Sequence, residues 1–383
     1  MKTYFYLLLA LGLCFNLHAR AWQTTIWPDS ICVGGQEMHV QGIALDTTRK
    51  CMYFSFTNRL LKTDLNGNIL GSVDGLEGHL GAIALNPEDG CLYASLECKN
   101  DEIGRGIARK MGFDLPEGHN QSVFYIAIFD PDRIVRTGQT PQDSSVMKSV
   151  CVKEAVADFS AQVTHKGKKA LHRYGCSGID GIMFAPPVGE GTSASRLLYV
   201  GYGIYGDTTR TDNNHQVLLS YRPADLKHFA RRMDWKKPHF SGPHKPLRKY
   251  FVYTGNTNYG IQNMTYDEGT GTAFLAVYRG KKKAFPNYPL FMLDMKAAPY
   301  RSRLNGVDEP QKKWIIPLCR KGSFDKGMYG WHFPWGSTGI CAVGNGCFYI
   351  SENGKDDKGK QYCKARLYRF VGKNGIAFRQ IDE

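Results

Sequence analysis

A two-strand pattern that repeats five times constrains the fold more than any other feature of the chain. The first strand of each copy is a short run such as Gln41-Gly-Ile-Ala-Leu-Asp46, and a second strand such as Cys51-Met-Tyr-Phe-Ser55 follows after a polar turn. The copies open near residues 41, 81, 180, 262 and 338. Units of this kind bury their apolar faces against their neighbours. The sequence therefore predicts a repeat protein built from successive β-hairpins.

Two more extended segments follow each hairpin. Third strands are expected at 60–64, 123–130, 217–221, 290–294 and 367–370, and fourth strands at 69–73, 150–152, 250–253, 314–318 and 376–380. Four antiparallel strands per unit, with no segment of helical period between them, are typical of β-propeller blades. We expect an all-β propeller of five four-stranded blades, with six blades as the alternative. A short extended stretch at 25–27 or 31–33 would pair with the last blade and close the ring.

The first 21 residues resemble a secretory signal, with Lys2, an apolar run over residues 6–15, and Ala19-Arg-Ala21 as a small-x-small cleavage site. We expect a signal peptide over 1–21 and a single propeller domain over 22–383, in a secreted or periplasmic protein. The apolar run is too short to span a bilayer, so no transmembrane segment is expected. A lipid anchor at Cys14 is disfavoured because Leu13 is larger than the residue that usually precedes such a cysteine.

The chain is basic. Its formal net charge of +14 falls to about +12 when Lys2 and Arg20 leave with the signal. Such an excess favours an anionic partner, above all an acidic or sulfated glycan, although a solvated surface without a partner explains it as well. The basic runs are dispersed and no nucleic-acid motif is present, so no nucleic acid is expected. We expect a monomer.

Ten of the eleven cysteines lie beyond the signal. Cys51, Cys91 and Cys347 open the second strand of three different units, a position that suits a small buried residue. An exported chain can also oxidise its thiols. The disulfide candidates are Cys91 with Cys98, Cys151 with Cys176, and Cys319 with Cys363. No spacing matches a zinc ribbon.

A functional surface is predicted where the loops that enter the first strands and leave the second strands meet on one face. The entering set is His39, Gln41, His79, Ser177, Asp180, Tyr259, Gln262, Asn263, Trp331, His332, Trp335, Ser337 and Thr338, and the leaving set is Asn58, Glu97, Tyr202, Tyr205, Arg279, Lys281, Glu352 and Asn353. The long insertions at 99–120, 206–215, 280–289 and 354–362 open on the same face. Long loops on a rigid scaffold usually carry binding.

Three histidines of this surface, His39, His79 and His332, are expected to cluster with Asp180. Neutral imidazoles and a carboxylate can bind a divalent metal such as zinc, whereas the oxygen-bearing residues of the same funnel would suit calcium. The same four residues are the expected catalytic groups if the protein works by acid/base chemistry. Alternatively, the histidines only bridge blades. Gly178 and Gly181 flank Asp180 and allow either close approach of a ligand or a tight strand entry.

Ligand-binding residues are predicted around the same funnel. Arg279 and Lys281 suit an anionic group, and Tyr288, Trp331 and Trp335 could stack on a sugar ring. The alternative is that these aromatic residues pack between blades. The other expected ligand-binding residues are Gln41, Tyr202, Gln262, Asn263 and Asn353.

The motif Gln41-Gly-Ile-Ala-Leu-Asp46, with Tyr53-Phe-Ser55 and the stretch Lys62-Thr-Asp-Leu-Asn-Gly67, resembles the repeats of NHL-type propellers and of the gluconolactonase (senescence marker protein) superfamily. The likeness is good in the first two units and weaker in the others. The resemblance implies a propeller. In the gluconolactonase group a Glu, an Asn and an Asp hold a divalent metal, and Asn263 and Asp180 match two of these places. No Glu stands at the third.

The sequence thus predicts a secreted propeller that binds an anionic carbohydrate in its axial funnel, with hydrolysis or another cleavage of that ligand left open. A non-catalytic glycan- or protein-binding propeller is the first alternative, because a shared scaffold does not specify a reaction. A metal-dependent, lactonase-like hydrolase is the second.

Overall fold

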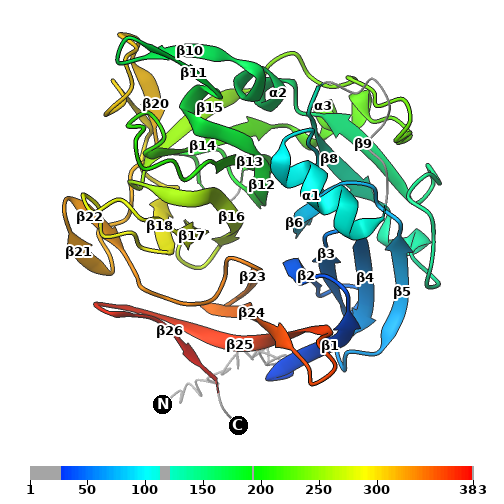
Figure 1. Cartoon of the computed structure of the whole chain (residues 1–383). Coiled ribbons are helices and arrows are strands. Elements are labelled where there is room, and N and C mark those ends of the chain that lie inside the picture. Colours follow the sequence, from blue (N-terminus) through cyan, green and yellow to red (C-terminus); the bar gives the residue numbers. More distant parts are fainter. Residues whose placement is uncertain (1–26, 113–120, 192–193, 382–383) are drawn as a thin grey trace, which may run out of the picture.

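The computed structural model describes residues 27–112, 121–191 and 194–381 of the chain. Five antiparallel sheets stand in a ring around a common axis (Figure 1). The protein is therefore a five-bladed β-propeller, and the six-bladed alternative is wrong. The expected signal peptide lies outside the described residues. None of the described helices is both long and apolar enough to cross a membrane.

Each blade is a meander of consecutive strands. Blade 1 contains β2 (Val40–Asp46), β3 (Cys51–Phe56), β4 (Arg59–Asp64) and β5 (Ile69–Asp74). Blade 2 contains β6 (His79–Leu85), β7 (Leu92–Cys98), β8 (Val123–Phe129) and β9 (Met147–Cys151). Blade 3 contains β12 (Cys176–Ala185), β13 (Leu197–Ile204), β14 (His215–Tyr221) and β15 (Arg248–Tyr253). Blade 4 contains β16 (Thr257–Asp267), β17 (Thr272–Arg279) and β18 (Leu290–Asp294), and blade 5 contains β23 (Ile340–Gly344), β24 (Cys347–Lys355), β25 (Gln361–Lys373) and β26 (Ile376–Gln380).

The ring is closed by a strand from the beginning of the chain. Strand β1 (Ser30–Gln36) pairs antiparallel with β25, and Ile31 faces Ala365 in this pairing. Strand β26 pairs with the other half of β25, from Tyr368 onward. Ile31 is fully buried. The predicted closure by residues 31–33 is confirmed, and it removes an open sheet edge from the last blade.

Blade 4 has three full strands, and the segment predicted as its fourth strand, 314–318, is divided. Leu318 forms an isolated antiparallel bridge with Leu293 of β18, as a fourth strand would, but the bridge does not extend into a strand. Strand β20 (Lys313–Ile315) instead pairs parallel with β15 of blade 3 and antiparallel with β19 (Tyr300–Ser302). The guanidinium groups of Arg248 and Arg301 lie 5.4 and 5.7 Å from the ring of Trp314. These cation–π contacts favour the outer edge of blade 3 for this segment.

The connections contain helices that the sequence pattern did not predict. They are α1 (Glu102–Met111), α2 (Lys153–Ser160) and α3 (Pro223–Phe229). The connections also contain two hairpins, β10 (Gln162–His165) with β11 (Lys168–Leu171) and β21 (Ser323–Asp325) with β22 (Met328–Gly330). Asp101 caps α1 by accepting a hydrogen bond from the Gly104 amide, and Gly112 ends the helix in the left-handed conformation.

The core lies between the blades and uses the repeated second strand. Its tyrosines Tyr53, Tyr93, Tyr199 and Tyr349 are all fully buried. Since an exposed tyrosine is common, four at the same position with no exposure identify this strand as the packing element of the ring. All ten described cysteines are free thiols, so the expected disulfides do not form in the structure.

Candidate functional site

Several of the polar residues predicted around the axis form hydrogen bonds with one another, between blades and within blade 5. The Asn263 amide of blade 4 donates to the Gln41 carbonyl of blade 1 at 2.8 Å and to the Ser337 carbonyl at 2.9 Å. Thr338 donates to the Asn353 side chain at 3.0 Å. These contacts fix the orientation of the side chains around the axis.

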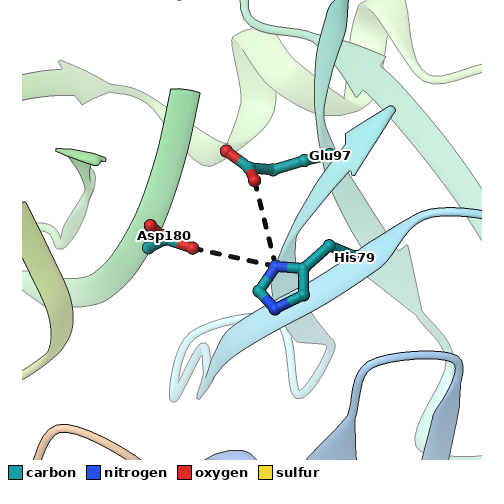
Figure 2. A group of neighbouring side chains, drawn as sticks. All are labelled: His79, Glu97 and Asp180. Carbon is teal, nitrogen blue, oxygen red and sulfur yellow. Dashed lines mark ion pairs between the residues drawn. The ribbon is translucent and has the colours of Figure 1, made fainter. Parts of the chain in front are cut away.

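Three ionisable side chains converge near the axis, on the side of blades 2 and 3. The ligand atoms of His79, Glu97 and Asp180 all lie within 4.8 Å of one another. The Nδ1 atom of His79 is 3.9 Å from Glu97 Oε2 and 3.8 Å from Asp180 Oδ1. Figure 2 shows both carboxylates turned toward this nitrogen. His79 starts β6, Glu97 is near the end of β7, and Asp180 is within β12, so antiparallel pairing and blade packing bring them together.

A buried lysine completes this cluster. The ammonium of Lys99 is 2.9 Å from Glu97 Oε2 and donates to the Ser177 carbonyl at 3.1 Å. The Ile179 amide donates to Glu97 Oε1 at 2.7 Å. Glu97 is 3 % exposed and Lys99 is 8 % exposed. Both oxygens of Glu97 are therefore engaged, one by a cation and one by the backbone.

Asp180 has a different environment from Glu97. Its Oδ2 atom accepts a hydrogen bond of 3.0 Å from the neutral Gln262 amide, while Oδ1 faces His79. Burial raises the pKa of Asp180 well above its usual range, the Glu97 carboxylate adds to this rise, and Lys99 and Gln262 oppose it. Burial also raises the pKa of Glu97, but Lys99 opposes that rise through direct contact. The pair is therefore expected to share one proton, held by Asp180.

Burial is the main reason that His79 is neutral. Burial, the charge of Lys99 and the neighbouring His39 together lower the pKa of His79 to about 3, with burial as the largest cause. Burial alone would lower the pKa of Lys99 as well, but Glu97, Asp180 and Asp101 outweigh burial and hold it above its usual value. The cluster accordingly combines a carboxyl group at Asp180 whose protonated form is favoured, a neutral imidazole at His79 and a Glu97–Lys99 ion pair.

Glycines around Asp180 create the space for this cluster. A Cβ atom at Gly178, where φ is +125°, would lie 1.9 Å from Glu97 Oε1. A Cβ atom at Gly203 would lie 2.9 Å from Asp180 Oδ2, and one at Gly181 would lie 2.4 Å from Ile261 Cγ2. These glycines make room for neighbouring protein groups, so the tight strand entry is the interpretation that the structure supports.

The expected three-histidine cluster does not form among the described residues, because only His79 belongs to the group of ligand atoms. His39 is half-buried, and its Nε2 atom is 3.0 Å from the Gln41 amide nitrogen. His332 is exposed, and its ring lies 4.8 Å from that of Tyr288. The segment before β23 places His332 beside the 280–289 loop, away from the axis.

The predicted ligand-binding aromatic residues do not line the funnel. Tyr202 is fully buried and donates to Asp158 at 3.0 Å. Tyr288 and Trp331 are 2 % and 1 % exposed, and Trp331 donates its ring N–H to the Lys373 carbonyl. Trp335 packs against the core between blades 4 and 5. Packing between blades, the alternative interpretation, explains these residues. Arg279 and Lys281 are exposed at the ends of inner strands, as expected.

Helix α1 lies over blade 2, beside the centre of the ring (Figure 1). At its beginning, the Tyr205 hydroxyl donates to Asp101 Oδ2 at 2.5 Å. Near its end, the charge of Lys110 contributes to lowering the pKa of His39, after burial. The helix therefore extends from the junction of blades 2 and 3 toward blade 1.

Two residues of the cluster were absent from the predicted catalytic set. Glu97 was placed on the correct face, but Lys99 was counted only as the start of an insertion. The signal for Glu97 was the unusual Gly178, since a glycine inside a strand marks a close approach by another group. The sequence alone did not show that the approaching group is a side chain of blade 2.

The fold and the site together define this protein as a five-bladed β-propeller with a buried ionisable cluster at one end of its axis. No family model and no curated protein matches the sequence. Among solved structures, the chain is similar to the calcium-binding protein regucalcin from Agrobacterium tumefaciens, with 12 % identity over 90 % of this chain and 95 % of that chain and a TM-score of 0.33. A protein of unknown function from Bacteroides caccae matches with 9 % identity over 75 % of this chain and 89 % of that chain, at a TM-score of 0.32. Similarities this low carry no argument about function.

Proposed function

We propose that the protein binds an acidic carbohydrate at the mouth of its funnel and cleaves it with Asp180 as proton donor and His79 as proton acceptor. One observation supports this proposal above the others. The same burial moves the pKa of Asp180 upward and the pKa of His79 downward, although the two side chains are 3.8 Å apart. Adjacent groups whose pKa values are separated in this way are typical of acid/base catalysis.

Glu97 and Lys99 would act as positioning residues. Because Glu97 is held by Lys99 and by the Ile179 amide, it is not free to attack a substrate. Its negative charge keeps the proton on Asp180, and the positive charge of Lys99 keeps the proton off His79. The ion pair thus adds to the effect of burial on both pKa values, which it moves in opposite directions.

Elimination from a uronate residue is the reaction that fits these roles best. His79 would take the proton from the carbon next to the carboxylate, and the bond from the neighbouring carbon to the glycosidic oxygen would break. Asp180 would give its proton to that oxygen, and a carbon–carbon double bond would form in the sugar ring. Hydrolysis by two carboxylates fits less well, because it requires a second carboxylate that can act as nucleophile or base.

The surroundings of the cluster suit an acidic sugar. Arg279 and Lys281 are exposed at the mouth and could bind carboxylates. Tyr259 is 42 % exposed, and its carbonyl accepts a hydrogen bond from Gln262, the partner of Asp180. Its φ of +61° is unusual for a residue with a side chain, and such strain is often found at functional sites. Its ring would offer a face for a sugar to stack on.

A divalent cation is the second candidate, because one imidazole and two carboxylates lie within 4.8 Å. These donors are suited to a transition metal such as zinc. The fit is incomplete, since the Lys99 ammonium is already 2.9 Å from Glu97 Oε2 and would repel a second cation there. The site would then supply His79 and Asp180 as ligands, and the metal would polarise a bound carbonyl, as a lactonase-like reaction requires.

Turnover of acidic polysaccharides with and without EDTA tests these alternatives. Polygalacturonate, alginate, hyaluronan and heparin would be compared for wild type, Asp180→Asn and His79→Gln, with Asp132→Asn as a control at an exposed carboxylate that pairs with Arg49. We expect unsaturated products from wild type, a loss of roughly a hundredfold or more in the two site variants, and no change in the control.

The other outcomes decide between the alternatives. Activity that EDTA abolishes would favour the metal site, and binding without turnover would favour the non-catalytic glycan-binding propeller. Absence of both binding and turnover on all four polymers would refute the carbohydrate proposal.

A further inference from the structure

A second cavity lies above blade 3, on the same face as the funnel. It has a volume of about 550 Å³ and lies between the β10–β11 hairpin and residues 207–210. Its lining includes Lys166, Lys168 and Arg210, and Asp207 is the carboxylate among its described lining residues. Arg210 is paired with Asp212. The charges of Lys166 and Lys168 are exposed and have no ion-pair partner in the part of the chain that the structure describes.

The cavity has rigid walls. Lys166 and Gly167 both have positive φ angles, +50° and +75°, and form a tight turn. The turn places Lys168 directly opposite His165 in the hairpin. Across the cavity, Arg210 donates to the Leu171 carbonyl at 2.5 Å and to the His172 carbonyl at 2.8 Å. The two lysines are thus held by a hairpin that is fastened to the opposite wall.

A chain of contacts leads from this cavity to the funnel. The ring of His172, in the cavity wall, lies 4.9 Å from the ring of Tyr205. Tyr205 in turn donates to Asp101, the residue that caps α1 and follows Lys99 by two positions. These contacts place the cavity beside the start of α1, on the blade 3 side of the Asp180 cluster.

The geometry points to this cavity as a second anion subsite, which binds another carboxylate or sulfate of the same polyanionic chain. This inference rests on the proposed function and defines its substrate as an oligosaccharide with repeated acidic groups. A substrate with one acidic group would leave the two exposed ammonium groups outside the funnel without a partner. Two cations whose backbone is held by a hairpin suit successive anions of a polymer, because the hairpin itself then needs no ordering on binding.

Binding of oligosaccharides of different length tests the inference. The dimer and the hexamer of galacturonate, and a heparin-derived hexasaccharide, would be titrated into the Asp180→Asn protein, in which turnover is blocked. The same titrations would be made after adding Lys166→Ala with Lys168→Ala, or Lys236→Ala with Lys237→Ala as a control that removes two other exposed lysines. Thermal melts check that all three proteins are folded.

We expect the first lysine pair to weaken binding of a hexamer roughly tenfold and to leave the dimer unchanged, with little effect from the control pair. Whichever hexamer responds identifies the anion as carboxylate or sulfate. Equal losses for dimer and hexamer, equal losses in the control, or no binding of either hexamer would overturn the subsite. If wild type cleaves the polymer but the lysine substitutions do not change hexamer binding, only the second subsite is refuted. If the lysine substitutions weaken hexamer binding but wild type does not cleave the polymer, only the proposed reaction is refuted.

Discussion

The ion pair between Lys99 and Glu97 gives a quantitative test of the cluster. Its two charged atoms are 2.9 Å apart, and the side chains are only 8 % and 2 % exposed. In Lys99→Met the carboxylate of Glu97 would stay buried beside Asp180, with the Ile179 amide as its remaining donor. Removing one partner of a buried pair typically costs about 3–5 kcal/mol. We expect a loss of this size at pH 7, a large part of the stability of an ordinary domain.

The pH dependence separates a charge effect from lost packing. Without Lys99, the pKa of Glu97 in the folded protein rises further above its value in the unfolded chain. Stability from a carboxyl group with a raised pKa is present at low pH and is lost as the pH rises through the folded pKa. The loss caused by Lys99→Met should therefore be smaller at pH 5 than at pH 7. Adding Glu97→Gln, which removes the buried charge but keeps an oxygen for Ile179, should restore most of the stability.

Urea unfolding of the two single variants and the double variant at both pH values measures these effects. Lys313→Met is the matched control, because Lys313 pairs with Glu309 at 2.8 Å but the two side chains are 25 % and 29 % exposed. An exposed pair should cost less than about 1 kcal/mol. Equal losses for Lys99→Met and Lys313→Met, or a Lys99→Met loss that does not depend on pH, would refute the argument.

Three further predictions follow from the structure. Gly178→Ala should destabilise the fold by about 3 kcal/mol or more in thermal melts, because its Cβ would lie 1.9 Å from Glu97 Oε1, whereas Gly106→Ala, where a Cβ meets open space, should be neutral or stabilising by up to about 1 kcal/mol. His79, with a pKa of about 3, should show no protonation between pH 8 and pH 5 in NMR spectra of its ring nitrogens; since the unfolded chain binds this proton near pH 6.5, stability should fall as the pH drops below that value, and a midpoint near 6 would contradict the proposed burial. A chain that begins at residue 37 lacks β1 and should melt at a lower temperature and form oligomers in size-exclusion chromatography through the exposed edge of β25; unchanged behaviour would show that closure is dispensable.

The architecture could be predicted from the sequence because its signals are local. Each first strand carries its own apolar pattern, and each second strand repeats a tyrosine such as Tyr53 that the ring buries completely. The parts that were missed depend on distant contacts. The segment at 313–315 joins blade 3 because it pairs in parallel with β15, and no pattern within it distinguishes that edge from blade 4. Helix α1 depends on two single-residue caps within a long insertion.

The candidate site was predictable only in part, for a similar reason. His79 and Asp180 occupy repeated positions at the starts of inner strands, so their approach to the axis followed from the repeat. Lys99 occupies no repeated position, and its role appears only when blades 2 and 3 are packed together. His332 also precedes the first strand of its blade, β23, but the segment between them is longer, and the His332 ring lies against Tyr288 instead of joining His79. Side-chain direction in a loop depends on its length and contacts, which a repeat does not specify.

The pairing of β1 with β25 has a consequence for how the protein acquires its structure. The first strand to be synthesised must wait for nearly the last, because its partner residues 361–366 come at the other end of the chain. Until then both partners expose unsatisfied backbone groups, and a nascent molecule could join with a neighbour instead of with itself. Closure of the ring should therefore be limited by the synthesis of β25, and a circular permutation that places β1 shortly after β26 should shorten that vulnerable interval.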